Sequence, residues 1–149
     1  MVMGRYDLLA FAIFALSRLF VLYQFELYVS DTTVYHYVAT NGIQHGLKAY
    51  QDFFFPYPPI ALLLMYLPVW LGGSVESFLL YRFAFQKQMF LIEFALFTWM
   101  FFWIRKIFPK RESLFFEFSL LYSLCGLLQG HLLFDRIDLG VALCLFGSV

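Results

Sequence analysis

Asp31 is the residue of this sequence whose type and position best fit catalysis. It lies two positions past the end of a long apolar run, and Tyr35 and His36 follow one helical turn later. A carboxylate at the point where an apolar segment meets water can act as a general base, because substrate still reaches it there. Aspartate is also favoured at helix N-caps, so the position alone leaves catalysis and capping both open.

A second polar segment carries Asp52 and the aromatic stretch that ends in Tyr57, Pro58 and Pro59. Aromatic rings before a double proline form a stiff amphipathic rim, since proline fixes φ and lacks an N–H group. Such a rim can hold a sugar ring or a prenyl chain. It can equally be the aromatic belt that membrane proteins place at the bilayer surface.

The histidines His36 and His45, together with Asp31 and Asp52, contain enough donor atoms for a divalent metal. No spacing among these four residues matches a known ligand pattern. We therefore expect no cofactor, and a divalent metal held by some of these four residues is the alternative.

Charged residues inside the apolar runs form a further group. Arg18 and Glu93 fall near the middle of two such runs, where a lone charge is costly. We expect a buried ion pair between neighbouring helices; the alternative is that Arg18 faces a cavity and helps to hold a lipid phosphate. Farther along, a polar cluster between two apolar runs fits either an ordinary loop or a helix entrance that lines a cavity; it consists of Asp135, Arg136 and Asp138.

The composition indicates that these residues are positioned by a framework in lipid. The 149 residues are 62% hydrophobic and only 13% charged, whereas a soluble domain is about half apolar and a quarter charged. So few charges cannot cover the surface of a soluble fold, and we expect an all-α, polytopic bundle of four to five transmembrane helices. The formal net charge of zero gives no reason to expect a nucleic-acid partner.

A membrane-crossing helix needs about 20 mainly apolar residues. On this basis we place spans at residues 7–29, 57–71, 78–104 and 113–128, with a truncated span from residue 139. Because the last run is too short to cross a bilayer, we expect residues 1–149 to be the N-terminal part of a single longer domain.

The loop at residues 30–56 is predicted to contain a short amphipathic helix at the membrane surface. Ser30 or Asp31 would cap this helix and Asn41-Gly42 would end it. Its apolar face is predicted from the helical spacing of Val34, Tyr37 and Val38.

The charge distribution leaves the topology open. With a cytoplasmic N-terminus, the loop holding Asp31 lies outside, but so does the basic cluster at residues 105–111, against the positive-inside tendency. The reversed orientation puts Asp31 in the cytoplasm. A third arrangement, in which residues 57–71 dip into the membrane without crossing it, satisfies both conditions.

Several segments taken in order resemble the polyprenyl-phosphate-sugar-dependent glycosyltransferases of the GT-C superfamily, most closely the glycosyltransferase 87 (mannosyltransferase-like) family. The resemblance covers residues 5–149, the front part of such an enzyme. One departure is Phe55-Pro56, which stands where an acidic residue is common. The segments are an arginine-bearing first span leading into Ser30-Asp31 with Tyr35, then Ala49-Tyr50-Gln51-Asp52-Phe53, Tyr57-Pro58-Pro59-Ile60-Ala61 with Leu67-Pro68, Tyr81-Arg82-Phe83-Ala84-Phe85, and Phe134-Asp135-Arg136-Ile137-Asp138.

The resemblance implies an integral, multi-pass membrane glycosyltransferase, a hexosyltransferase-type enzyme with its first loop outside the cytoplasm. It would move a mannose-like hexose or pentose from a polyprenyl-phosphate donor to a lipid or glycan acceptor, with inversion. Asp31 matches the first-loop aspartate and would be the general base. Membrane lipids would surround the enzyme. The C-terminal part of the enzyme, which this chain lacks, could be a separate partner chain. The substrate-binding residues would be Tyr35, His36, Asp52, Tyr57, Arg18, Arg136 and Asp138.

A different class of protein remains open: a non-catalytic small membrane subunit or transporter component. Such a protein would use Arg18, Glu93 and Asp138 along a polar path through the membrane. A third interpretation is an inactive fragment of the enzyme.

Overall fold

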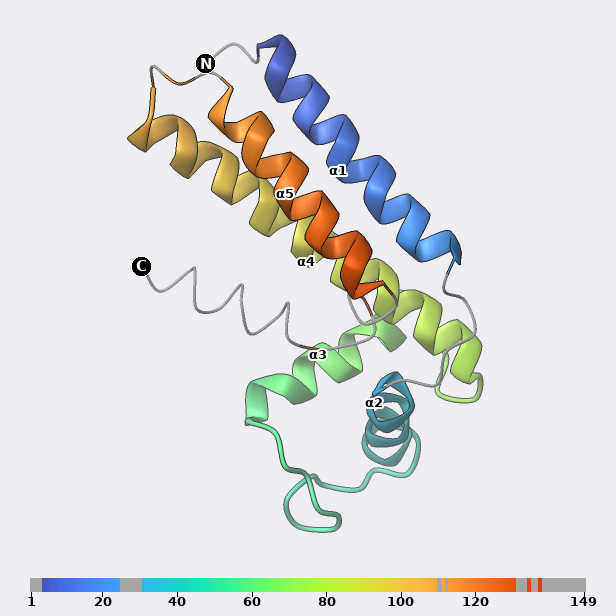
Figure 1. Cartoon of the computed structure of the whole chain (residues 1–149). Helices are drawn as coiled ribbons and strands as arrows, with labels where there is room; N and C mark the ends of the chain where they lie inside the picture. Colours follow the sequence, from blue (N-terminus) through green and yellow to red (C-terminus); the bar gives the residue numbers. More distant parts are fainter. Residues whose placement is uncertain are drawn as a thin grey trace. The chain divides into compact units, whose positions relative to one another are not determined.

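A computed structural model describes residues 4–24, 31–109, 111, 113–130, 134 and 137, and over these residues the fold is all-helical (Figure 1). The prediction of an all-α protein is confirmed at this level. Arg136, Asp138 and the truncated span from residue 139 lie outside the described residues. The helices are α1 (Arg5–Gln24), α2 (Thr32–Ala39), α3 (Pro59–Trp70), α4 (Phe78–Ile107) and α5 (Leu114–Gln129), and a π-helical turn, Thr40–Gln44, continues α2.

The chain divides into two compact units. Unit 1 comprises residues 1–28 and 93–133, and therefore contains α1, the second half of α4 and α5. Unit 2 comprises residues 29–92 and 134–149, and contains α2, α3 and the first half of α4. The sequence-based expectation of a single domain stays a prediction.

One helix in the described part of the chain, α1, is long and apolar enough to cross a membrane by length and composition. Its 20 residues extend about 30 Å, the thickness of the hydrocarbon core. Helices α3 and α5 are shorter apolar helices of 12 and 16 residues. Helix α4 is 30 residues long but carries charged residues along its length.

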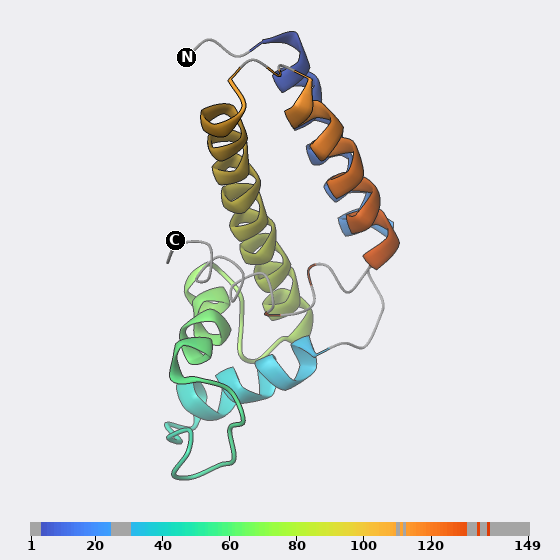
Figure 2. The same ribbon diagram turned by 60° about the vertical axis from the view of Figure 1, so that its left-hand side comes forward.

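Within unit 1, aromatic rings hold α1, α4 and α5 side by side (Figures 1 and 2). Phe14 of α1 stacks on Phe97 of α4 with ring centroids 4.1 Å apart, and Phe101 of α4 contacts Phe115 of α5 at 4.8 Å. The ring centroids of Phe11 and Phe101 are 5.6 Å apart. Phe11 thus contacts a later residue of α4 than Phe14 does, so the two helices run in opposite directions. Helices α1 and α4 are therefore antiparallel in this unit.

Within unit 2, α4 binds α3 at a proline in the interior of α3. Pro68 has no N–H group, so the carbonyl of Leu64 four residues earlier loses its helical donor. The side chain of Gln88 donates from Nε2 to this carbonyl over 3.0 Å. The hydroxyl of Tyr81 donates to the next carbonyl, that of Met65, over 2.7 Å. Tyr81 and Gln88 are seven residues apart and therefore share one face of α4.

The predicted apolar face of α2 is only partly the face that packs inside unit 2, and its contact with a membrane surface stays a prediction. Val34 and Tyr37 are 48% and 61% exposed, whereas Val38 is buried. The buried face consists instead of Thr32, Tyr35, Val38 and Ala39. Packing within unit 2 selects this face, because it places the Tyr35 ring 5.2 Å from the ring of Phe85 on α4.

The predicted end of this helix at Asn41-Gly42 is also wrong, because a π-helical turn continues to Gln44. Gly42 does not end the helix; a glycine is required here by close packing against another residue. A Cβ atom at this position would overlap the hydroxyl of Tyr66 on α3. The glycine therefore allows the backbone after α2 to approach the Tyr66 side chain closely.

Candidate functional site

The start of α2 positions Asp31 and Tyr35. Asp31 occupies the N-cap position, but its side chain makes no capping hydrogen bond. The backbone carbonyl of Asp31 closes the first turn by accepting from the N–H groups of Val34 at 2.9 Å and Tyr35 at 3.1 Å. The capping interpretation of this aspartate therefore lacks the side-chain hydrogen bond on which it depends. The Asp31 side chain is partly exposed.

A row of aromatic rings extends from Tyr35 into the predicted aromatic rim. The ring of Tyr57 lies 6.2 Å from that of Tyr35 and 5.5 Å from that of Phe55. Phe55 in turn meets Tyr50 edge-on at 5.3 Å. The structure thus brings together Tyr35, Tyr57 and the segment that holds Asp52, all within unit 2.

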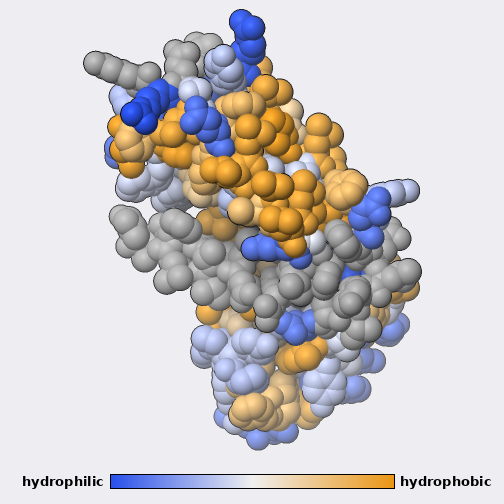
Figure 3. Space-filling view, viewed as in Figure 1, coloured by the Kyte–Doolittle hydropathy of each residue, from blue (hydrophilic) through white to orange (hydrophobic). Residues whose placement is uncertain are grey.

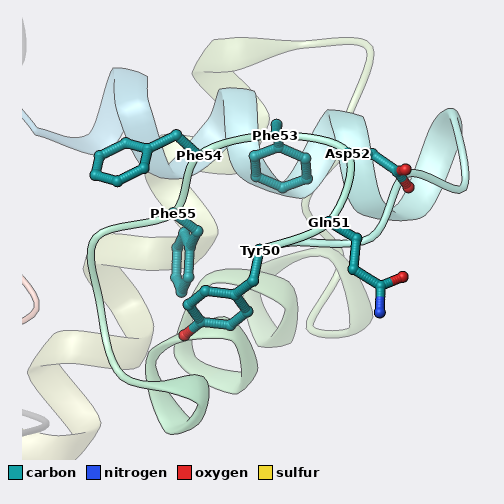
Figure 4. Close-up of a pocket in the computed structure, with 6 residues that line it drawn as sticks. All are labelled: Tyr50, Gln51, Asp52, Phe53, Phe54 and Phe55. Carbon is teal, nitrogen blue, oxygen red and sulfur yellow. The ribbon is translucent and has the colours of Figure 1, made fainter.

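This segment borders an open surface hollow of about 360 Å³, lined by residues 50–55 (Figure 4). Figure 4 shows the rings of Tyr50 and Phe55 side by side, with Gln51 and Asp52 pointing away from them. The Asp52 carboxylate accepts a hydrogen bond from the backbone N–H of Lys48 at 2.7 Å and is otherwise exposed. A carboxylate oxygen has further lone pairs, so Asp52 can still accept a hydroxyl donor.

Tyr50 gives the hollow a defined shape. Its φ of 69° lies in the left-handed region, which is uncommon for a residue other than glycine. The Tyr50 hydroxyl donates to the backbone carbonyl of Tyr57, and its ring packs on Phe55. Strained backbone of this kind persists where the surrounding contacts hold it, and it is concentrated at binding sites.

His36 lies in a different environment from Asp31 and Tyr35. Its Nε2 is 2.9 Å from the carbonyl oxygen of Val75, so Nε2 carries the proton and donates. The imidazole ring also contacts the rings of Tyr81 at 5.1 Å and Phe78 at 5.7 Å. The position of His36 therefore serves the contact between α2 and the beginning of α4.

Arg18 belongs to unit 1, and the ion pair expected with Glu93 is confirmed. Arg18 Nη2 lies 2.6 Å from Glu93 Oε1, and the two side chains are 1% and 0% exposed. The guanidinium also lies 4.9 Å from the ring centroids of both Phe14 and Tyr122. A Cβ atom at position 126 would overlap this guanidinium, so Gly126 makes room for it. Contact with a lipid phosphate would require the guanidinium to leave these partners.

Sequence reasoning did not single out Tyr81, Arg82 or Gln88 as functional candidates, although all three are buried. The spacing of the buried residues carries the signal that could have found them. Along α4, Tyr81, Phe85, Gln88 and later residues recur every three or four positions, which marks one packed helix face. A polar residue on such a face must find a partner.

Over the part of the chain that the structure describes, no three His, Cys, Asp or Glu side chains gather as metal ligands would. The described cysteine, Cys125, is a free thiol on an exposed position. The predicted contacts of Arg136 and Asp138 fall outside the described residues.

Comparison with protein-family models, with curated proteins and with solved structures finds no match to this chain. The resemblance to the GT-C glycosyltransferases therefore stays a prediction.

Proposed function

We propose that this chain is the front part of an inverting membrane glycosyltransferase of the GT-C type. It would move a mannose-like hexose or pentose from a polyprenyl-phosphate donor to a lipid or glycan acceptor. The observation that carries the proposal is the arrangement of unit 2. There, an aspartate at a helix start, not used for side-chain capping, lies one turn from an aromatic row that leads to a hollow.

The exposed surface of unit 1 supports the multi-pass membrane location that this function requires. Large apolar side chains point outward from α1 and α5, and hydrophobic atoms cover much of the face that these helices present (Figure 3). Soluble monomers rarely expose apolar patches of this extent. Among the most exposed side chains are Leu8 (61%), Leu16 (67%), Tyr23 (78%), Leu121 (67%) and Leu128 (79%).

The proposal places crossings at α1, α4 and α5, of which α1 alone among the described helices is long and apolar enough by itself, and it lets α3 dip into the membrane. The 12 residues of α3 extend only about 18 Å, well short of a hydrocarbon core of about 30 Å. The charge of Glu93 does not prevent α4 from crossing, because Arg18 neutralises it. This arrangement has three crossings in place of the four to five expected from the apolar runs, because residues 57–71 do not cross in it and the run from residue 139 lies outside the described residues.

In the proposed reaction, Asp31 acts as general base. Its carboxylate takes the proton from the acceptor hydroxyl as that oxygen forms a bond to the anomeric carbon. The bond between the anomeric carbon and the phosphate oxygen breaks, and the polyprenyl phosphate leaves with the electron pair. A single displacement inverts the anomeric configuration.

The aromatic hollow is proposed to hold the sugar. Tyr50 and Phe54 are 51% and 88% exposed, so their rings are available to stack on the apolar face of a hexose. Asp52 belongs to the same segment and has accepting capacity for a sugar hydroxyl. Tyr57 joins the hollow to Tyr35 and so to the helix that begins at Asp31.

The test is sugar transfer by the Asp31→Asn variant. Membranes are prepared from the cells that naturally make the protein and are supplied with a synthetic polyprenyl-phosphate [¹⁴C]mannose. The radioactivity transferred to the lipid and glycan fractions is then counted. Loss of the general base is expected to lower the rate by about 10²–10⁴-fold. The matched control is Glu76→Gln, the same amide-for-carboxylate change at an exposed position of unit 2 outside the hollow.

Unchanged transfer by Asp31→Asn, with normal amounts of chain in the membrane, would contradict the proposal. The alternative, a non-catalytic subunit or transporter component, requires the charged residues inside the helices to matter more than Asp31. Glu93→Gln then abolishes function while Asp31→Asn does not. The closed ion pair of Glu93 with Arg18 gives less support to an open polar path through unit 1.

A further inference from the structure

Three helix ends meet at one end of unit 1. An ion pair between Asp7 and Arg105 joins the first turn of α1 to the last turns of α4. Tyr6 of α1 lies 6.0 Å, ring to ring, from Phe116 near the start of α5. The beginning of α1, the end of α4 and the beginning of α5 are therefore neighbours, as Figures 1 and 2 both show.

Basic side chains gather at this end. Arg5, Lys106 and Arg111 are exposed, and within the described part of the chain none of the three takes part in an ion pair. A further described cation, Arg105, is offset by Asp7. Hydrophilic atoms are correspondingly visible at the end where α1 begins, above the apolar face of the unit (Figure 3).

Aromatic side chains adjoin these cations. Trp99, Phe102, Trp103 and Lys106 line a hollow of about 310 Å³ on the outer side of α4. The two indoles are 43% and 40% exposed, and Lys106 Nζ lies 5.8 Å from the ring centroid of Trp103. Exposed tryptophans are enriched where a membrane protein meets the headgroup layer, and lysines above them extend their ammonium groups to the water side.

We propose that this end of unit 1 is a collar that binds anionic phospholipid headgroups; the collar consists of Arg5, Trp99, Trp103, Lys106 and Arg111. The indoles lie at the level of the headgroups, and the cations Arg5, Lys106 and Arg111 meet the phosphates. The anionic leaflet attracts such basic groups, and cytoplasmic surfaces carry the excess of Lys and Arg. The collar therefore marks the cytoplasmic side. This inference rests on the membrane location in the proposed function and not on the catalytic step.

The antiparallel order of α1 and α4 gives this inference a consequence for topology. Because the first turn of α1 pairs with the last turns of α4, Arg5 and the basic residues after α4 lie on the same side of the membrane. The charge distribution then no longer conflicts with an orientation in which the loop holding Asp31 lies outside. The basic cluster is cytoplasmic, and the segment that follows α1, with Asp31, emerges on the other side.

The test measures which lipid surrounds the collar. The full chain with Trp70→Phe keeps only Trp99 and Trp103 as tryptophans, and both belong to the collar. It is reconstituted into vesicles that contain equal fractions of phosphatidylglycerol and phosphatidylcholine, with bromine on the chains of one lipid or of the other. We expect brominated phosphatidylglycerol to quench the fluorescence roughly twofold more strongly, and added salt to weaken this preference.

Lys106→Gln with Arg111→Gln should remove the preference for phosphatidylglycerol. The matched control, Lys48→Gln with Lys87→Gln, removes two exposed lysines of unit 2 and should keep it. Equal quenching by both lipids overturns the collar but leaves the membrane location standing. Quenching by neither lipid overturns both. A preference that survives in the collar variant, or that is lost in the control, assigns the effect to overall charge and overturns the proposal. Failure of Asp31→Asn to affect transfer has no bearing on any of these outcomes.

Discussion

The buried pair of Arg18 and Glu93 is the most costly feature of the molecule at the scale of single residues. Both charges are removed from solvent and each is the main partner of the other. Losing one member strands the other charge, whereas replacing both by apolar residues of similar size is often neutral. Single and double variants of this pair can therefore distinguish a structural role of Arg18 from a role in binding substrate.

We expect Arg18→Met to lower the free energy of unfolding by about 3–5 kcal/mol, because Glu93 is left buried without its partner. The double variant Arg18→Met with Glu93→Met should regain most of this loss. Unfolding in mixed micelles, followed by far-ultraviolet circular dichroism, measures both. A double variant that is stable but no longer transfers sugar would contradict the structural role and restore the lipid-phosphate alternative for Arg18.

At the scale of elements, the proline in α3 and the glutamine on α4 act as a pair. Pro68 leaves the Leu64 carbonyl without a helical donor, and Gln88 supplies one from another helix. The Gln88 Oε1 atom itself has no partner among the described residues, so the amide is held there for its donor group alone. A buried carbonyl without any donor is expensive, and Gln88 supplies that donor from the same face of α4 that carries Tyr81.

The coupling of these two residues can be measured. Gln88→Leu should destabilise the chain more when residue 68 is proline than in a Pro68→Ala background, because alanine restores an N–H group to the Leu64 carbonyl. The expected difference is about 1–2 kcal/mol. A thermodynamic cycle of the four proteins in micelles gives it directly. Equal costs in both backgrounds would mean that the carbonyl does not depend on Gln88.

At the scale of the whole molecule, the antiparallel order within unit 1 predicts which segments face which side. In a background with Cys125→Ser and Cys144→Ser, a membrane-impermeant maleimide should label Gln51→Cys in intact cells. Ser113→Cys, at the start of α5, should be labelled only after the cells are opened. The physical reason is that, in the proposed topology, α1 crosses the membrane once between the basic end and the polar loop. The reverse labelling pattern would contradict the orientation.

The sequence predicted best what depends on long patterns, and least what depends on contacts between elements. Apolar runs located α1, α4 and α5 to within a few residues, and the cost of buried charge anticipated the pair of Arg18 with Glu93. The buried face of α2 was missed because Tyr35 packs on Phe85 of α4, and no local periodicity reveals that contact. Gln88 was missed because its partner is a backbone carbonyl made available by Pro68 elsewhere in the chain.

In the candidate site, the sequence brought out Asp31, Asp52 and Tyr57 by type and spacing. It also suggested His36 as a substrate-binding residue, but this side chain forms a hydrogen bond with the carbonyl of Val75. It also gave no sign that Tyr50 adopts a left-handed backbone, since that conformation is imposed by contacts with Phe55 and Tyr57.

The distance along the chain between Arg18 and Glu93 has a consequence for biosynthesis. The two residues are 75 positions apart, and a ribosome adds about 5–20 residues per second. If α1 enters the bilayer as it is made, its arginine waits roughly 4–15 s before Glu93 emerges. During that interval a lone arginine near the middle of the helix disfavours insertion. On this condition, Arg18 of α1 gains its buried partner only when Glu93 of α4 has been synthesised.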